Sequence, residues 1–181
     1  MSGFRHETPR LVLRSWRDED VDAFEEACNT PAVTRFLGGL QTREEIEAAV
    51  GRIRASEDED GYCFWVLERR DDGQFLGFCG LKTLAAEGAP SAILGQPEIG
   101  WRLREGVWGQ GYAREAAMAS LDLAFTRFGM EHVYAMTLAD NAGSWGLMKR
   151  IGMRAMPEHD FDMPLYGRHV VYRIGRHEWT E

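Results

Sequence analysis

The stretch GVWGQGYAREAA, from Gly106 to Ala117, places three glycines within six residues directly before a strongly helical segment. The residues from Glu98 to Arg104 have the pattern of a strand, so the order is strand, glycine-rich turn, helix. The start of a helix presents backbone N–H groups without intrahelical acceptors and carries a partial positive charge. Because glycine has no Cβ, a ligand can approach such a turn closely. The stretch therefore predicts a site for a phosphate compound.

The details of this turn separate three classes of phosphate site. Gly106 and Gly111 have the spacing of a nucleoside-triphosphate loop, but tyrosine and alanine follow where that loop needs Lys and Ser or Thr. Gly109 and Gly111 match the first two glycines of a dinucleotide fingerprint, but the third position is Arg114, which is too large for close packing of helix on sheet. The remaining class is a pyrophosphate held by backbone amides without a metal, and coenzyme A is such a ligand.

The rest of the chain predicts one mixed α/β domain over residues 1–181. Asp18 is placed to cap the first helix, and Thr42 with Glu45 has the pattern of a capping box for the second. The three strands in the middle of the chain are expected to form an antiparallel meander. The expected strands are 10–16, two within 62–84 that meet at a hairpin turn at Asp72-Gly73, 98–104, 131–140, 169–179 and a piece within 153–163; the expected helices are 17–29, 42–57, 112–128 and 142–152.

The helix after the glycines has one continuous apolar face, small in its first half and bulky in its second. Small residues let the start of the helix lie close to a sheet, and Gly129 stands where a C-terminal cap belongs. Core packing explains this face completely, so only the N-terminus of the helix is a candidate for function. The face consists of Ala113, Ala116, Ala117, Ser120, Leu121, Ala124, Phe125 and Phe128.

Composition limits the class of protein. Apolar residues make up 44% of the chain and charged residues 28%, as in an ordinary globular protein, and no apolar run approaches the length of a membrane span. The N-terminus lacks the apolar core of a signal peptide, so we expect a cytoplasmic protein. The formal net charge of −8 disfavours nucleic-acid binding. Cys28, Cys63 and Cys79 are odd in number and far apart, which disfavours disulfides and a zinc site, and we expect no metal.

The glycine-rich turn resembles the acetyl-CoA motif of the GNAT acetyltransferase superfamily. Gly109, Gly111 and Ala113 match the Gly-x-Gly-x-Ala part of that motif, whereas its usual basic or amide first residue is absent. Trp108, directly before the first motif glycine, is similar to the branch that acetylates ribosomal-protein N-termini (the Rim-type branch). The opening RLVLRSWRDEDVDAF, from Arg10, also resembles the start of that branch, a first strand followed by an acidic helix.

A second block, NAGSWGLMKRIGM (Asn141–Met153), resembles the family segment that follows its fifth strand. Asn141, Ser144 and Gly152 match the pattern, and Arg150 supplies a basic residue in the usual Lys place. The separation between the two blocks is also that of the family, so the resemblance covers nearly the whole chain.

The resemblance implies a mostly antiparallel sheet of six to seven strands flanked by about four helices. It implies that acetyl-CoA lies where two neighbouring parallel strands, here 98–104 and 132–139, splay apart and free backbone groups for the pantetheine amides. Arg114 could instead be an exposed helix arginine, and Asn141 could instead cap or turn the backbone. The implied cofactor-binding residues are Leu103, Trp108, Gly109, Gln110, Gly111, Tyr112, Ala113, Arg114 and Asn141.

The implied reaction is acyl transfer from a thioester to a neutral amine, which needs a general base. Glu98 is the candidate base, with an ordinary surface glutamate as the alternative, and the backbone N–H of Leu103 is the candidate oxyanion donor. Where many family members have a Tyr that protonates the leaving thiolate, this chain has Met148. Ser144 is the candidate replacement unless it caps the short helix. Unassisted departure is also open, since a thiol has a pKa of only about 8.5.

The acceptor is the least constrained part of the function. The negative charge favours a cationic amine or basic peptide, and the branch resemblance favours a protein or peptide N-terminus. A small-molecule amine acceptor, a non-catalytic acyl-CoA-binding module and a nucleotide-dependent kinase are the alternatives. Residues that face the acceptor are expected on the first two helices, in the loop within 84–96 and on the last hairpin. The family also implies a homodimer.

Overall fold

The structure is a computed structural model that describes residues 3–180. These residues form nine strands, five α-helices and three 3-10 helices. The chain falls into two units, one made of the residues up to Gly80 with Trp101–Ala116, the other of Leu81–Gly100 with the residues from Ala117 onward. The elements that run from one unit into the other are β4 (Phe75–Thr83), β5 (Pro97–Leu103) and α4 (Tyr112–Thr126). That the whole chain is one domain stays a prediction.

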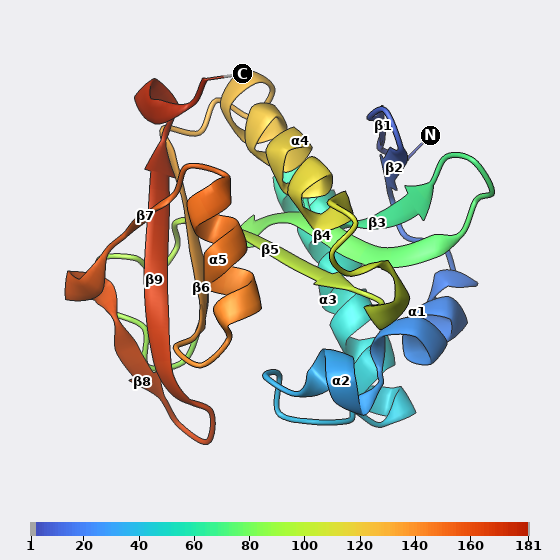
Figure 1. Cartoon of the computed structure of the whole chain (residues 1–181), viewed down its shortest axis with the longest axis horizontal. Coiled ribbons are helices and arrows are strands. Elements are labelled where there is room, and N and C mark those ends of the chain that lie inside the picture. The colour runs from blue at the N-terminus through green and yellow to red at the C-terminus, as the bar shows by residue number, and fades with distance from the viewer. Residues whose placement is uncertain (1–2, 181) are drawn as a thin grey trace. The chain divides into compact units, whose positions relative to one another are not determined.

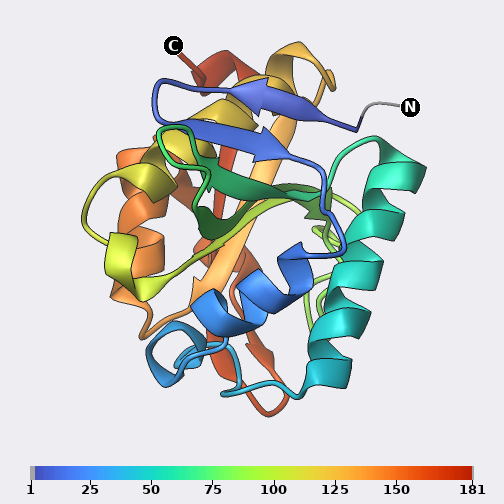
Figure 2. The same ribbon diagram turned by 90° about the vertical axis from the view of Figure 1, so that its right-hand side faces the viewer.

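The first unit pairs its N-terminal strands with the hairpin strand that follows the helices. β1 (Arg5–Glu7) pairs antiparallel with β2 (Leu11–Arg14), which pairs antiparallel with β3 (Phe64–Arg69). All four residues of β2 are buried, as expected for a strand with neighbours on both edges. Between β2 and β3 lie α1 (Asp20–Cys28), α2 (Pro31–Thr34) and α3 (Arg43–Asp60), with α1 beside α3 (Figure 2).

The start of α3 confirms the predicted capping box. The Thr42 side chain accepts a hydrogen bond from the backbone N–H of Glu45, and the Glu45 carboxylate accepts one from the backbone N–H of Thr42. At the other end, Gly61 takes a left-handed conformation with φ of 79° and closes the helix. Both ends of this helix are therefore determined by residues that lie close together in the sequence.

The predicted cap of the first helix is wrong. α1 begins after Glu19 without a side-chain cap, and Asp18 instead pairs with Arg54 of α3 at 2.9 Å. The Asp20 carboxylate accepts from the backbone N–H of Arg17 at 2.7 Å and also binds an arginine of β2. Asp20 is buried because it binds Arg14 of β2, which lies outside the helix. The sequence around the helix does not identify this partner.

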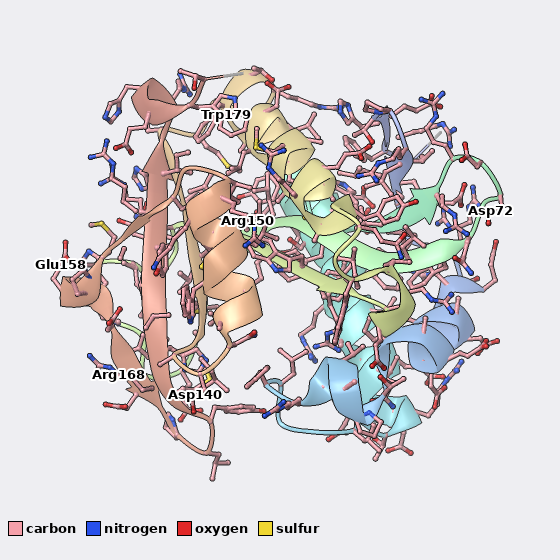
Figure 3. The ribbon with its side chains drawn as sticks, in the orientation of Figure 1. Asp72, Asp140, Arg150, Glu158, Arg168 and Trp179 are labelled. Carbon is pink, nitrogen blue, oxygen red and sulfur yellow. The ribbon has the colours of Figure 1, made fainter. Side chains whose placement is uncertain are left out.

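The predicted hairpin is confirmed. β3 and β4 pair antiparallel on either side of a loop in which Gly73 has φ of 71°, a conformation that glycine adopts without strain. Asp72 accepts hydrogen bonds from Arg69 in the same loop, and Figure 3 labels it there. Further along β4, a Cβ on Gly77 would collide with the carbonyl oxygen of Arg102 on β5. The glycine therefore permits a close approach of two backbones within the first unit.

The second unit is organised around β9 (Gly167–Gly175). β6 (His132–Leu138) pairs antiparallel with β9 along its whole length, and α5 (Ala142–Arg150) lies against both strands (Figure 1). The short strands β7 (Arg154–Ala155) and β8 (Phe161–Met163) also pair with β9. A buried apolar cluster in this unit contains Leu84, Ile93, Tyr134, Phe161 and Val171.

Most of the predicted face of α4 is buried. Ala116, Ala117, Leu121 and Ala124 have no exposed surface, and the chain turns at Gly129 with φ of 65°. Ser120 and Phe125 are buried as well, whereas Ala113 and Phe128 at the ends are half-buried. The helix therefore packs in the core, as the helical spacing of its apolar residues predicts.

Hydrogen bonds connect the strands in the order β1-β2-β3-β4-β5-β6-β9-β7, with β8 beside β9. β5 and β6 are parallel, with Glu98 opposite Tyr134. The predicted mixed, mostly antiparallel sheet with a parallel pair is confirmed, whereas the widening between that pair stays a prediction. The predicted number of elements is too low for residues 3–180, because β1, β7, β8 and α2 have only two to four residues each. Such short segments have too few residues to show a helical or strand periodicity in the sequence. Whether they form depends on the segments with which they pair.

Candidate functional site

The glycine-rich turn has the backbone that its sequence predicts. Gly109 and Gly111 are left-handed, with φ of 72° and 83°. Around Gly109 a Cβ would meet no atom within 4 Å, so the conformation, rather than a lack of space, requires glycine there. The residues from Trp108 to Gly111 are exposed, and Trp108 keeps 49% of its surface accessible. A turn of this kind leaves its backbone open to a ligand.

Two side chains fix the entry to the turn. The indole Nε1 of Trp108 donates to the carbonyl oxygen of Leu103 at 2.9 Å. The amide of Gln110 donates to the carbonyl oxygen of Gly106 at 3.0 Å. Both are therefore structural partners of the turn, and the carbonyl of Leu103 already has a donor. Its backbone N–H is the group of Leu103 that suits the predicted contact with a pantetheine or an oxyanion.

An arginine near the N-terminus of the chain anchors the turn from outside. Arg10 donates from Nη1 to the carbonyl oxygen of Gln110 at 2.9 Å and from Nε to Glu115 at 2.6 Å, and its guanidinium stacks on the Tyr112 ring at 4.3 Å. The Glu115 carboxylate also accepts from the Thr8 hydroxyl at 2.6 Å. Burial opposes the charge of Glu115, but its bonds to Thr8 and Arg10 outweigh this and lower its pKa.

This anchor was not predicted from the sequence, because Arg10 and Glu115 are 105 positions apart and neither belongs to a local pattern. Its effect on the site is electrostatic as well as mechanical. Because Glu115 is neutralised by Arg10, the first turn of α4 does not present a free carboxylate to an anion. The first hydrogen bond of the helix runs from the N–H of Glu115 to Gly111, which leaves the earlier N–H groups without intrahelical acceptors. Ala113 is half-buried, and Arg114 is exposed on the helix.

Glu98, the candidate base, is a buried carboxylate rather than a surface glutamate. It keeps only 6% of its surface accessible and stands opposite Tyr134 in the parallel pair. Lys82 on β4 approaches its Oε2 with Nζ at 3.3 Å, but Oε2 is buried and has no partner in hydrogen-bond geometry. Burial raises the pKa of Glu98, and Lys82 only partly opposes the rise. A carboxylate in this state is suited to accept a proton.

Other titratable groups lie along the same strand pair in the second unit. His132 meets Gln96 at 2.7 Å through Nε2, and burial lowers the pKa of this imidazole. The Tyr134 ring makes T-shaped contacts with the rings of His132 and His159. In the loop within 84–96, Leu84 and Ile93 belong to the buried cluster, whereas Glu87, Ser91 and Leu94 are exposed. That this loop faces the acceptor stays a prediction.

The sequence left open whether Asn141 or Ser144 caps the short helix, and the structure assigns the cap to Asn141. Asn141 is the N-cap of α5: its Oδ1 accepts from the backbone N–H of Ser144 at 3.3 Å, and its Nδ2 donates to Thr137 at 3.0 Å. Ser144 does not cap the helix, and within residues 3–180 its hydroxyl has no hydrogen-bond partner. The hydroxyl is half-buried and so remains able to donate to a ligand. Figure 3 labels Asp140 before this helix and Arg150 in its last turn.

Met148 is 1% exposed and packs in the core of the second unit. Its thioether has no proton to donate. No group of three or more His, Cys, Asp or Glu side chains suited to a metal ion occurs in the described part of the chain. Within the same residues, no helix combines the length and apolar character needed to cross a bilayer.

The mixed sheet with its parallel pair and the left-handed glycine turn before α4 are the backbone features that the GNAT resemblance leads us to expect. Comparison with known proteins agrees. Residues 10–154 match the family described as the acetyltransferase (GNAT) domain. The chain belongs to this family of acetyltransferases and is an acyltransferase. Members of the family use acetyl-CoA as the acyl donor.

The chain is similar to known proteins over most of its length. The N-acetyltransferase YoaA of Bacillus subtilis (strain 168), whose name calls it uncharacterized, is 30% identical over 151 residues, which are 82% of this chain and 81% of YoaA. A crystal structure of an acetyltransferase from Agrobacterium tumefaciens str. C58 is 25% identical with a TM-score of 0.81, covering 96% of this chain and 95% of that one. The ribosomal-protein-S5-alanine acetyltransferase of Vibrio fischeri is 14% identical with a TM-score of 0.71, covering 98% and 100%, and shares the fold.

Proposed function

We propose that the protein transfers the acetyl group of acetyl-CoA to a primary amine, with Glu98 as general base. The observation that carries the proposal is the buried Glu98 carboxylate, whose Oε2 has no hydrogen-bond partner and whose pKa is raised by burial. It lies on β5, the strand that leads into the glycine turn. A carboxylate oxygen without a hydrogen-bond partner can take the proton of an attacking amine directly or through one water.

The residues of the turn fit a pyrophosphate. The N–H groups from Gly109 to Ala113 are the proposed donors, because both glycines are left-handed and exposed and Glu115 is neutralised by Arg10. Trp108, Gln110 and Tyr112 support this binding indirectly, by holding the turn through Leu103, Gly106 and Arg10. Arg114 is exposed on the helix and adds a positive charge near the phosphates.

When bound, acetyl-CoA supplies a thioester carbonyl that an amine can attack. Glu98 accepts the proton that the amine loses, and the N–H of Leu103 donates to the developing oxyanion. The Ser144 hydroxyl donates a hydrogen bond to the departing thiolate, because it is half-buried and has no partner within residues 3–180. Asn141 uses its remaining amide hydrogen toward the pantetheine while it caps α5.

The acceptor class is proposed from the sequence. The Rim-type resemblance of WGQGYAREA and the net charge of −8 favour the amine of a peptide or protein N-terminus. A small-molecule amine is the second candidate. A non-catalytic acyl-CoA-binding module is the third, and the replacement of the family tyrosine by the buried Met148 favours it. A cytoplasmic location and a homodimer complete the proposal.

Two measurements test this function. A thermal-shift assay with acetyl-CoA and with Mg-ATP should give stabilisation by acetyl-CoA alone. Stabilisation by Mg-ATP alone would overturn the assignment in favour of a kinase. An acetyl-transfer screen over N-terminal peptides and small amines should then give turnover with a peptide, whereas tight CoA binding without transfer to any amine would establish the non-catalytic module.

A further inference from the structure

The short loop between β1 and β2 is bound to the glycine turn within the first unit. The backbone N–H of Arg10 donates to one carboxylate oxygen of Glu115 at 2.8 Å, and its Nε donates to the other at 2.6 Å. Its Nη1 donates to the carbonyl oxygen of Gln110 at 2.9 Å, and its guanidinium covers the Tyr112 ring. One arginine thus binds the middle of the turn and the first turn of α4 together.

The loop holds this arginine in place. The N–H of Thr8 donates to the carbonyl oxygen of Leu11 at 2.9 Å, and the N–H of Leu11 donates to the Thr8 hydroxyl at 3.0 Å. Arg70, directly after β3, donates from its backbone N–H to the carbonyl oxygen of Arg10 at 3.0 Å and from Nη1 to that of Thr8 at 2.8 Å. Because the backbone on both sides of Arg10 is bonded, its side chain projects from a fixed point.

The glycine turn depends on contacts of this kind, because glycine restricts a backbone least. Gly109 and Gly111 are both left-handed and exposed. Arg10 lies against Gly111, since its Nη2 would be 3.3 Å from a Cβ at that position. A flexible turn loses conformational freedom when a ligand fixes it, whereas a turn that is already fixed loses less and binds more tightly.

Arg10 also determines the charge that the turn presents to a ligand. Burial opposes the charge of Glu115, but its bonds to the Thr8 hydroxyl and to Arg10 lower its pKa, so this carboxylate is ionised at pH 7. Without Arg10, the first turn of α4 would carry an uncompensated negative charge beside the N–H groups from Gly109 to Ala113. A like charge at this place disfavours an anionic ligand.

We propose that Arg10 is a positioning residue for the acyl donor, because it holds the glycine turn in the conformation that binds the pyrophosphate and neutralises the carboxylate beside it. The inference rests on the proposed binding of acetyl-CoA at this turn. It gives the loop before β2 a part in donor binding without contact to the donor, although Arg10 and Gln110 are 100 positions apart in the sequence.

The test measures the affinity for CoA by isothermal titration calorimetry at pH 7. Arg10→Gln should raise the Kd by about tenfold or more, because the turn loses its anchor and Glu115 loses its counter-ion. Arg10→Lys should recover part of the affinity, since an ammonium neutralises Glu115 but lacks the planar fork that reaches Glu115 and Gln110 together.

Kinetics separate a positioning role from a general loss of folded enzyme. In Arg10→Gln the KM for acetyl-CoA should rise, while kcat and the KM for the amine should stay within about twofold of the wild type. A loss of folded enzyme would instead lower kcat and leave both KM values unchanged. A fall in kcat without a rise in the KM for acetyl-CoA would therefore contradict the inference.

A second substitution separates the two contributions of Arg10. The double variant Arg10→Gln/Glu115→Gln lacks both the anchor and the carboxylate. Its affinity for CoA should exceed that of Arg10→Gln by about two- to fivefold, because the uncompensated charge is gone. No recovery would contradict the electrostatic part of the inference.

Arg5→Gln is the matched control, because Arg5 lies on β1 just before the same loop and pairs with Glu7 at 2.7 Å on the surface. It should leave the Kd unchanged. A Kd of Arg10→Gln equal to that of the wild type, or a Kd raised equally by Arg5→Gln, would overturn the inference. Thermal unfolding of each variant above the titration temperature confirms that folded proteins are compared.

If the wild type does not bind CoA, the proposed function fails, and the backbone order of the free protein then decides alone whether Arg10 positions the turn. NMR relaxation gives the order parameters of the N–H groups of Gly109 and Gly111. They should be about 0.85 in the wild type and below about 0.6 in Arg10→Gln. Equal order parameters in the two proteins contradict the inference.

Discussion

Arg14 and Arg102 are two arginines of the first unit, the one buried and the other half-buried, and the chain treats their charges in opposite ways. Arg14 donates twice to Asp20, at 2.7 and 2.8 Å, and once to Glu68 at 2.8 Å. Burial opposes its charge, yet the bonds to both carboxylates outweigh burial and raise its pKa. Arg102 has aromatic rings and one amide around it, and burial lowers its pKa.

The difference separates a charge that two carboxylates neutralise within the fold from a charge that has no carboxylate partner among the described residues. Arg14 ties β2 to α1 and β3, and its removal leaves two carboxylates without a counter-ion. Arg102 has no carboxylate to offset its desolvation, so we expect it to stabilise the protein less than Arg14 does. Glu98 in the second unit resembles Arg102 in this respect, since its Oε2 is buried without a hydrogen-bond partner.

The largest expected effect is on stability at Arg14. Replacing Arg14 by Met leaves Asp20 charged and buried, so the free energy of unfolding should fall by about 3–5 kcal/mol. Urea denaturation measures it, with Arg43→Met as a surface control that should change it by less than about 1 kcal/mol. A loss at Arg14 no larger than that of the control would remove the distinction between the two arginines.

The next effect is on catalysis. Glu98→Gln should lower kcat by about 10²-fold or more, because the amide cannot accept a proton. Stability at pH 7 should not fall, since a raised folded-state pKa means that the stability contributed by Glu98 is present at low pH and lost as the pH rises through that pKa. The variant Glu131→Gln, an exposed neighbour at the start of β6, serves as the control. Unchanged turnover in Glu98→Gln would exclude it as the base.

The same carboxylate predicts a pH dependence. The wild type should lose kcat/KM as the pH falls through the raised pKa of Glu98, because the base is then protonated. The acidic limb should therefore lie at a higher pH than the pKa of an exposed glutamate, about 4.3. A limb at or below that value would show that burial does not act on the catalytic group.

The smallest expected effect is on stability at Arg102, and it tests the difference between Arg102 and Arg14 directly. Arg102→Met should change the free energy of unfolding by less than about 1 kcal/mol, because the lost bond to Gln41 is offset by the removal of an uncompensated charge. The same urea titration used for Arg14→Met measures it. A loss as large as that of Arg14→Met would make Arg102 a structural residue of the same kind as Arg14.

Local patterns predicted those parts of the site whose partners are near in sequence. The left-handed glycines at 109 and 111, the helix that follows them and the capping box of Thr42 each depend on residues within a few positions. The roles of Asn141 and Ser144 remained ambiguous for the same reason, because a cap and a ligand contact use the same residue types. The structure gives the cap to Asn141 and leaves the Ser144 hydroxyl open.

The sequence by itself determined the strand, turn and helix of GVWGQGYAREAA, the class of its ligand and the mixed order of the elements. Tertiary structure alone decided which charges are neutralised. Arg14 meets Glu68 across 54 positions, Arg102 meets Gln41 across 61, and Arg10 meets Glu115 across 105. The physical reason is that helix starts and turns are stabilised by bonds between near neighbours, whereas the state of a buried charge depends on whatever the fold places around it.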